Sequence, residues 1–303
     1  MQTSKPGDFV AVTDQASKRI VVLDLDVKNW GAGKGVVWSW SPMTSRGWEG
    51  LEVNWGFPTD AKLRTNEVFG GQSMVITDSS GLAAIVPYAQ GGCKQWGRNV
   101  GGNPHSAELL PNGNIAIAAS TGGWVRVYTS SQGPDSGSYA EYALPGAHGV
   151  QWDPLLQILW ALGDDALVAL KICGEDRSPE LREAKRIPLP TRYGHDLQPV
   201  YGNTDRLWIS TGTKVYQYVK SADVFDESYP GSGSISRARV KSIGNTASGR
   251  VISTVPDGIV RPATGYEDND WCTDTIDLFD PNEQRVLPGS AVYKARVWNT
   301  EYL

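Results

Sequence analysis

Short runs of apolar residues recur along the whole chain, and polar or glycine-rich turns separate them. Examples lie at 115–118, 124–128 and 158–161, where Val, Ile, Ala and aromatic residues predominate. Runs this short, with turn residues at both ends, predict β-strands rather than helices. The segment 178–185 alone could form a helical turn, and the strand spacing around it argues against that. We therefore expect an all-β protein.

The predicted strands form a repeat of about 45 residues. Three histidines open three successive units: His148 follows His105 by 43 residues, and His195 follows His148 by 47. Each unit continues with two further strand-like runs after polar turns. A period of this length with three or four strands is typical of one blade of a β-propeller.

The repeat extends in both directions and accounts for both ends of the chain. The run 9–13 has the character of a second strand that lacks a first, and 292–298 that of a first strand on its own. Pairing them would complete a blade and close the ring, which leaves no open sheet edge. We count six blades in a single domain, 1–303, with seven as the alternative if loops near 42–58, 222–238 or 256–271 hide further strands. The six are 9–41 with 291–299, then 59–98, 105–144, 148–190, 195–230 and 240–288.

Composition narrows the choice of partners. The chain has 303 residues, 40% of them hydrophobic, which is enough for a substantial core. A net charge of -5 without any basic block argues against nucleic acid. No apolar run is long enough to cross a membrane, so we expect no membrane partner either. We also expect the protein to be a monomer. Twelve Trp, 12 Tyr and 34 Gly suit a protein that handles carbohydrate.

The three histidines are the strongest functional signal. The first strand of each propeller blade lines the central channel, so His105, His148 and His195 should surround one mouth of it. Tyr293 and Thr59 take the matching positions in other blades. The chain has no other histidine, which favours a functional cluster over structural hydrogen bonding between blades.

Polar residues also recur three positions after these histidines. Glu108, Gln151 and Gln198 would lie deeper in the channel, where their oxygens suit a calcium ion. The histidine nitrogens suit zinc or manganese better. A water-filled channel without an ion is the alternative.

Loop residues near the predicted mouth could bind an anionic sugar. Arginine recognises carboxylates with two parallel hydrogen bonds, and aromatic faces stack on sugar rings. The candidates for substrate binding are Arg98, Asn103, Arg192, Tyr193, Arg261, Arg296, Trp48 and Trp55.

The runs 102–111, 147–153 and 194–197 resemble a propeller family that includes the fungal L-rhamnose-α-1,4-D-glucuronate lyase of gum arabic side chains. The resemblance implies a secreted polysaccharide lyase with its signal peptide removed, and a calcium ion near the propeller centre. It also implies a histidine that acts as base and acid, carried over to His105. The family is expected to have seven blades, whereas the repeats in this sequence count to six, and we keep the count.

Such a lyase would remove the proton at C5 of glucuronate and expel the rhamnose at O4. The products are L-rhamnose and an unsaturated glucuronyl end. A cation must neutralise the carboxylate, and a base with a near-neutral pKa must take the proton. Histidine suits that role, with His148, His195 or Tyr293 as a second group. Two other classes stay open: a carbohydrate-binding or scaffold propeller without catalysis, and a metal-dependent hydrolase or lactonase.

Overall fold

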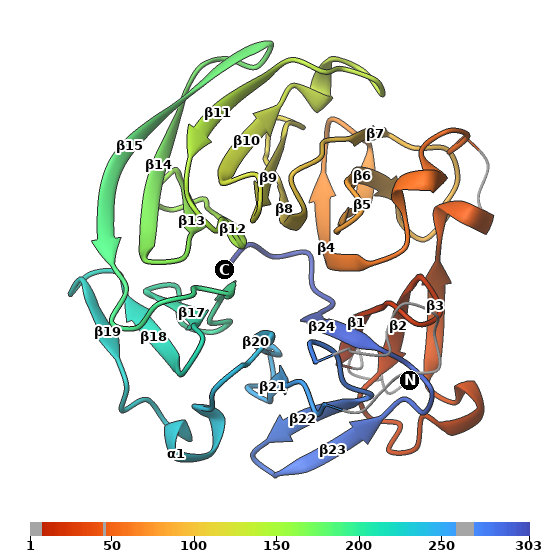
Figure 1. Cartoon of the computed structure of the whole chain (residues 1–303), viewed down its shortest axis with the longest axis vertical. Coiled ribbons are helices and arrows are strands. Elements are labelled where there is room, and N and C mark those ends of the chain that lie inside the picture. The colour runs from red at the N-terminus through yellow and green to blue at the C-terminus, as the bar shows by residue number, and fades with distance from the viewer. Residues whose placement is uncertain (1–7, 45–46, 259–269) are drawn as a thin grey trace, which may run out of the picture.

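The structure, a computed structural model, describes residues 8–44, 47–258 and 270–303. Six four-stranded antiparallel sheets form a ring (Figure 1). Within the described residues, no helix is long and apolar enough to cross a membrane. The segment 178–185 lies in a strand, as the repeat predicted, and the α-helix α1(Ser232–Ile235) is a single turn.

The six sheets are blades A to F, and the strands of each blade follow one another from the channel outwards. Blade A is β24(Val292–Val297), β1(Phe9–Asp14), β2(Arg19–Asp24) and β3(Val36–Trp40). Blade B is β4(Pro58–Asn66), β5(Gly71–Asp78), β6(Leu82–Pro87) and β7(Trp96–Asn99). Blade C is β8(Pro104–Leu109), β9(Ile115–Ala119), β10(Trp124–Tyr128) and β11(Tyr139–Ala143). Blade D is β12(Gly149–Asp153), β13(Ile158–Leu162), β14(Ala166–Glu175) and β15(Ser178–Pro188). Blade E is β16(Asp196–Pro199), β17(Arg206–Ser210), β18(Val215–Val219) and β19(Val224–Asp226). Blade F is β20(Ser242–Asn245), β21(Val251–Thr254), β22(Thr275–Phe279) and β23(Glu283–Val286).

The count of six blades and the closure of the ring are confirmed. The C-terminal strand β24 pairs antiparallel with β1, placing Val12 opposite Ala295, and so becomes the inner strand of blade A. Both ends of the chain therefore contribute to one sheet, and separating them would require breaking this ladder.

The strand sequences follow from where each strand lies in its blade. The middle strands β9 and β13 are buried at every position, because neighbouring blades cover both of their faces. The outer strand β11 alternates between exposed and half-buried residues, as expected for a strand with one face in water. Apolar clusters fill the spaces between blades; for example, Val125 of blade C and Leu159 of blade D belong to one buried cluster.

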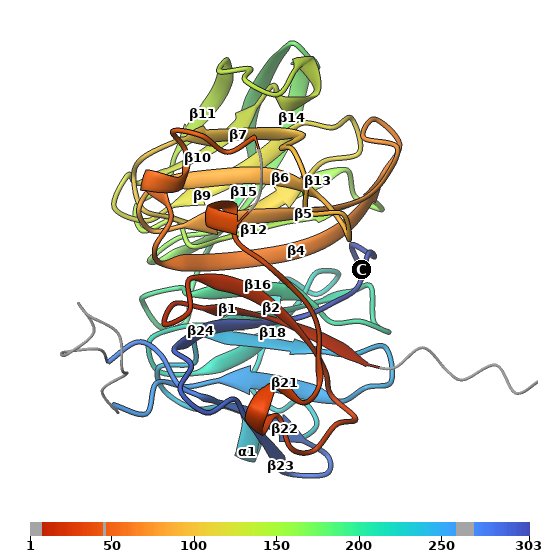
Figure 2. The ribbon, with the colours of Figure 1, turned by 90° about the vertical axis from the view of Figure 1, so that its right-hand side faces the viewer.

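The inner strands β4, β8, β12, β16, β20 and β24 surround the channel, and each contacts the inner strand of the next blade. Their first residues therefore meet at one end of the channel, and their last residues meet at the other. Figure 2 shows the same ring from the side, at 90° to the view of Figure 1. This arrangement decides which side chains share a site.

Candidate active site at the mouth of the channel

Five of the six inner strands place a polar side chain at the same mouth. Tyr293 and His105 are the second residues of β24 and β8, whereas His148, His195 and Lys241 directly precede β12, β16 and β20. All five line one pocket of about 680 Å³. Blade B has Thr59 at this position, but its hydroxyl donates to the carbonyl of Pro104 at 2.7 Å.

The three imidazole rings form a compact triangle, with 6.4 Å between the ring centres of His105 and His195. The ring centre of His148 lies 4.4 Å from that of His105 and 4.7 Å from that of His195. The hydroxyl of Tyr293 lies 3.0 Å from Nδ1 of His105 and 3.0 Å from Nε2 of His195. Blades B and F are the neighbours of blade A, so Tyr293 reaches His105 of blade C and His195 of blade E across the mouth of the channel. The contact with His105 joins residues 188 positions apart in the chain.

Lys241 is a pocket residue that the sequence motifs did not single out. Its Nζ lies 3.1 Å from Nε2 of His195. Burial lowers the pKa of Lys241 to about 8, so the ammonium form still predominates at neutral pH. The repeat could have identified Lys241, because this residue follows His195 by 46 residues and directly precedes an inner strand. Among the described residues that line the pocket, it is the one lysine or arginine.

The contact with Lys241 fixes the tautomer of His195. An ammonium group only donates, so Nε2 of His195 accepts and the ring proton lies on Nδ1. This Nδ1 is buried and has no hydrogen-bond partner among the described residues. A buried donor without an acceptor is costly, so this N–H is an unsatisfied group beside the pocket.

The tautomer of His148 is fixed in the same way. Its Nδ1 lies 2.7 Å from the carbonyl oxygen of Gly146, which can only accept, so Nδ1 carries the proton. The lone pair is therefore on Nε2. Burial lowers the pKa of His148 to about 4, which keeps the imidazole neutral at physiological pH. Burial likewise lowers the pKa values of His105 and His195 and raises that of the Tyr293 phenol.

Asn103 adds a second unpartnered group to the pocket. Its Oδ1 is buried without a hydrogen-bond partner among the described residues. Its backbone has a positive φ of 58°, a conformation that asparagine adopts more readily than most residues. The carbonyl of Asn103 accepts a hydrogen bond from the backbone N–H of Ser120 at 3.0 Å, which holds this loop. Backbone conformations of this kind concentrate at functional sites.

Below the mouth, the channel is filled by a buried network of ion pairs. Arg296 contacts Asp60 at 2.6 Å and Asp196 at 2.6 Å, and all three side chains are at most 2% exposed. Lys294, which is fully buried, lies 3.5 Å from Asp196 and donates to the carbonyl of His105 at 3.1 Å. Arg296 therefore forms part of the floor beneath the pocket and is not available to a substrate carboxylate.

Glu108 is also held by cations. Arg64 donates to its two carboxylate oxygens at 2.7 and 2.9 Å, and Lys62 lies 3.4 Å away. The side-chain amides of Gln151 and Gln198 donate hydrogen bonds to backbone carbonyls. Two cations beside Glu108 oppose a further positive charge there, whereas Oε1 of Gln151 is buried without a hydrogen-bond partner among the described residues. Within the described residues, no group of three or more His, Cys, Asp or Glu side chains could hold a metal.

The C-terminal segment covers the other end of the channel. The hydroxyl of Tyr302 donates to the carbonyl of Leu109 at the end of β8, and its own carbonyl accepts from Gln151 at 2.7 Å. The guanidinium of Arg64 lies 4.8 Å from the centre of the Tyr302 ring. Figure 1 shows this segment running to the middle of the ring. A ligand of the histidines therefore enters from the mouth.

The structure brings few of the other sugar-binding candidates to the pocket. Trp48 and Trp55 pack edge-on against Trp40 in the core between blades A and B. Arg98 donates to the carbonyl of Asp135 on the outside of its blade. Two further candidates, Arg192 and Tyr193, contact each other outside the pocket lining. Arg261 lies outside the described residues.

The fold and the mouth together define a six-bladed β-propeller with a histidine-rich pocket at one end of its channel. The chain belongs to the family of unknown function DUF6528, whose model matches residues 3–258. No curated protein matches the sequence.

Solved structures resemble the chain in fold alone. A protein of unknown function from Bacteroides caccae has 11% identity and a TM-score of 0.55, with 95% of this chain and 94% of that chain covered. A catalytically inactive histidine-to-alanine variant of virginiamycin B lyase from Staphylococcus aureus, with quinupristin, has 15% identity and a TM-score of 0.50. That comparison covers 95% of this chain and 87% of that chain. A streptogramin B lyase has 14% identity and a TM-score of 0.50, with 78% and 70% covered.

Proposed function

We propose that this protein is a carbon–oxygen lyase that acts on uronate glycans by β-elimination at the histidine-rich mouth. One observation carries the proposal: a neutral imidazole, a phenol hydroxyl and an ammonium group face one pocket, in His148, Tyr293 and Lys241. Elimination next to a carboxylate needs a base, a proton donor for the leaving oxygen, and a positive charge near the carboxylate.

Each role follows from the protonation that the contacts impose. The lone pair on Nε2 of His148 is free to accept the C5 proton. The ammonium of Lys241 can bind the uronate carboxylate and stabilise the charge that develops there. The Tyr293 hydroxyl remains protonated because burial raises its pKa, so it can donate to the leaving oxygen. This assignment prefers His148 over His105 as the base, since Nδ1 of His105 already contacts Tyr293.

The proposed step balances without any co-reactant. The C5–H bond breaks and its electrons form the C4–C5 double bond, while the C4–O4 bond breaks. His148 gains the C5 proton, and Tyr293 gives a proton to O4. After the products leave, the imidazolium gives its proton to solvent and the phenolate takes one from solvent, which restores both groups.

The resemblance of the motifs around the three histidines makes the rhamnose–glucuronate linkage of gum arabic the first substrate to test. L-Rhamnose would be the leaving group. Such a glycan lies outside the cell, so the proposal includes secretion of the enzyme. We also propose that the enzyme acts as a monomer. The distant likeness to propellers named as lyases agrees with an elimination reaction. Calcium stays a prediction that metal analysis of the purified protein can test, and no step above depends on it.

The experiment is to incubate the protein with gum arabic and with a synthetic rhamnosyl-glucuronate, and to follow ultraviolet absorbance. Elimination produces a conjugated alkene that absorbs, whereas hydrolysis and binding do not. Mass spectrometry should find a product lacking one water relative to hydrolysis. The alanine variants of His105 and His148 should keep the fold and lose turnover. Absence of the alkene from every glucuronate and galacturonate glycan tried would refute the proposal.

A further inference from the structure

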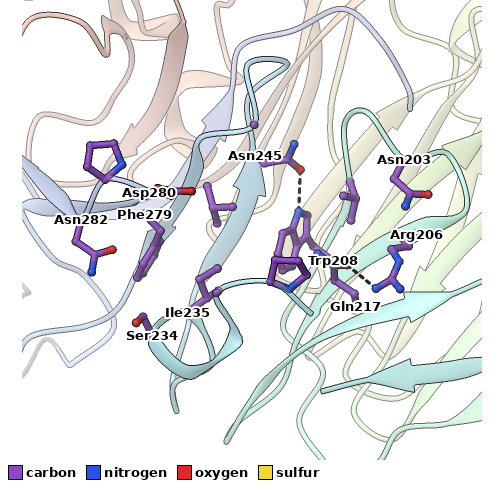
Figure 3. A pocket seen from close by; sticks show the side chains of 16 residues that line it. Asn203, Arg206, Trp208, Gln217, Ser234, Ile235, Asn245, Phe279, Asp280 and Asn282 are labelled. Carbon is purple, nitrogen blue, oxygen red and sulfur yellow. Dashed lines mark hydrogen bonds between the residues drawn. The ribbon is translucent and has the colours of Figure 1, made fainter. Parts of the chain in front are cut away.

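A second cavity lies between blades E and F, away from the mouth. It has a volume of about 710 Å³, within the range of small-molecule sites, and Figure 3 shows its lining. Val200 directly follows β16 and Asn245 ends β20, whereas His195 and Lys241 precede the same two strands. The two cavities therefore lie at opposite ends of the same strands, and a ligand in one does not touch the other.

The floor of this pocket is apolar and rigid. Trp208, Ile235 and Phe279 line it, and each is more than nine-tenths buried. The indole N–H of Trp208 donates to Oδ1 of Asn245 at 2.9 Å. Asn245 in turn donates to the carbonyls of Tyr201 and Thr246. Because the polar atoms behind the floor are already bonded to one another, the apolar surface is preformed.

The rim carries neutral polar side chains that can still form hydrogen bonds with a ligand. The side chains of Ser234 and Asn282 make no hydrogen bond within the part of the chain that the structure describes, and both are exposed. Gln217 accepts from Arg206 at 2.8 Å, which leaves its amide N–H groups for a ligand. The charge of Arg206 is compensated by Asp226 at 2.7 Å.

These features select one class of ligand. An anion would find no uncompensated cation among the described lining residues and would face the carboxylate of Asp280 on the rim. A wholly apolar ligand would cover the rim amides without bonding them, which is unfavourable. A neutral sugar ring has an apolar face for Phe279 and hydroxyl groups for the amides and for Ser234. We propose that this pocket binds a neutral sugar residue, independently of the mouth.

The test measures binding of D-galactose, L-arabinose and L-rhamnose to the full chain by saturation-transfer NMR and titration calorimetry. The wild-type protein should bind at least one of them at millimolar concentration. Ser234→Trp should fill the pocket and weaken binding at least about tenfold, the effect of losing about 1.4 kcal/mol of binding free energy. Asn282→Ala, at an exposed turn, should weaken it in the same direction without any risk to the core.

Two controls separate this proposal from that of the mouth. His148→Ala, which changes only the mouth pocket, should bind the sugar as the wild type does. Glu180→Ala, on the exposed strand β15, should also leave binding unchanged. If none of the three sugars binds, or if Ser234→Trp and Asn282→Ala bind as the wild type does, the proposal is wrong. Loss of binding in His148→Ala alone would place the sugar at the mouth and would also overturn it. Alkene formation is measured separately, so either proposal can fail without the other.

Discussion

Nζ of Lys241 lies 3.1 Å from Nε2 of His195, and this contact sets the direction of the hydrogen bonds in the pocket. The ammonium must donate, so Nε2 of the imidazole accepts and the ring proton lies on Nδ1. Lys241 thus supplies a positive charge to the pocket, where the described residues offer no set of metal ligands. The contact links blades E and F, which the ring holds side by side.

Replacing Lys241 by Met should lower kcat on a uronate glycan about 10²- to 10³-fold, because a group that stabilises the developing charge is lost. Lys241→Arg, which keeps the charge, should retain more activity than Lys241→Met. Steady-state kinetics of both variants check this. Equal activity of the Met variant and the wild type would exclude Lys241 from the reaction.

Replacing His148 by Ala should reduce turnover about 10²- to 10⁴-fold, the usual contribution of a general base. The matched control is Thr59→Ser, because Thr59 has the equivalent position in blade B and bonds to the backbone instead of facing the pocket. The control should keep wild-type turnover. Circular dichroism of both variants confirms the fold. If His105→Ala lost turnover and His148→Ala did not, the base would be His105, as the sequence resemblance implies.

Activity should be highest between about pH 4 and pH 8. His148 must be unprotonated to accept a proton, and its pKa is lowered to about 4, so turnover falls as the pH drops through that value. Lys241 must be protonated, and its pKa is lowered to about 8, so turnover falls again as the pH rises through that value. A pH profile of kcat/KM measures both limbs. In Lys241→Arg the alkaline limb should move upward; an unchanged limb would show that another group causes it.

The fold could be predicted from the sequence because the pattern of strands and turns repeats along the chain. A unit of about 45 residues fixes the blade, and the two incomplete units at the ends of the chain fix the closure that β24 and β1 make. The same period predicted that His105, His148 and His195 meet at one mouth, where the structure places them. Position within a repeat translates directly into position around the ring.

The rest of the site could not be predicted, because it depends on where loop side chains point. Trp48 and Trp55 lie in a loop predicted to reach the mouth, yet both rings are buried in the core and each donates its indole N–H to a backbone carbonyl. Arg296 is in register with the other inner strands, but its guanidinium pairs with Asp60 and Asp196, two acids for which no role was predicted from the sequence. Lys241 does face the pocket, but the sequence motifs did not identify it. The blade in the sequence begins at the apolar Val240, which draws attention away from the lysine beside it.

The ion pairs beneath the pocket should matter for stability more than any pair on the surface. Arg296→Met leaves the buried carboxylates of Asp60 and Asp196 without their main partner, so the free energy of unfolding should fall by about 3–5 kcal/mol. Urea denaturation of the variant measures this. Arg182→Ala, which removes an exposed pair with Glu180, should leave the unfolding midpoint unchanged. Equal midpoints for Arg296→Met and the wild type would show that the network adds nothing.

Tyr293→Phe tests whether the phenol takes part in the reaction or only positions the histidines. The hydroxyl contacts Nδ1 of His105 and Nε2 of His195, so its loss removes both the proposed proton donor and the link between these rings. We expect kcat to fall about 10²- to 10⁴-fold while KM changes little, because the carboxylate contacts of Lys241 remain. Tyr302→Phe is the matched control: its hydroxyl donates to a backbone carbonyl at the other end of the channel, so stability should fall slightly and kcat should not. A substrate with a better leaving group at O4 should restore part of the rate to Tyr293→Phe if the phenol donates the proton. If that substrate shows the same loss as the natural glycan, Tyr293 acts only as a positioning residue.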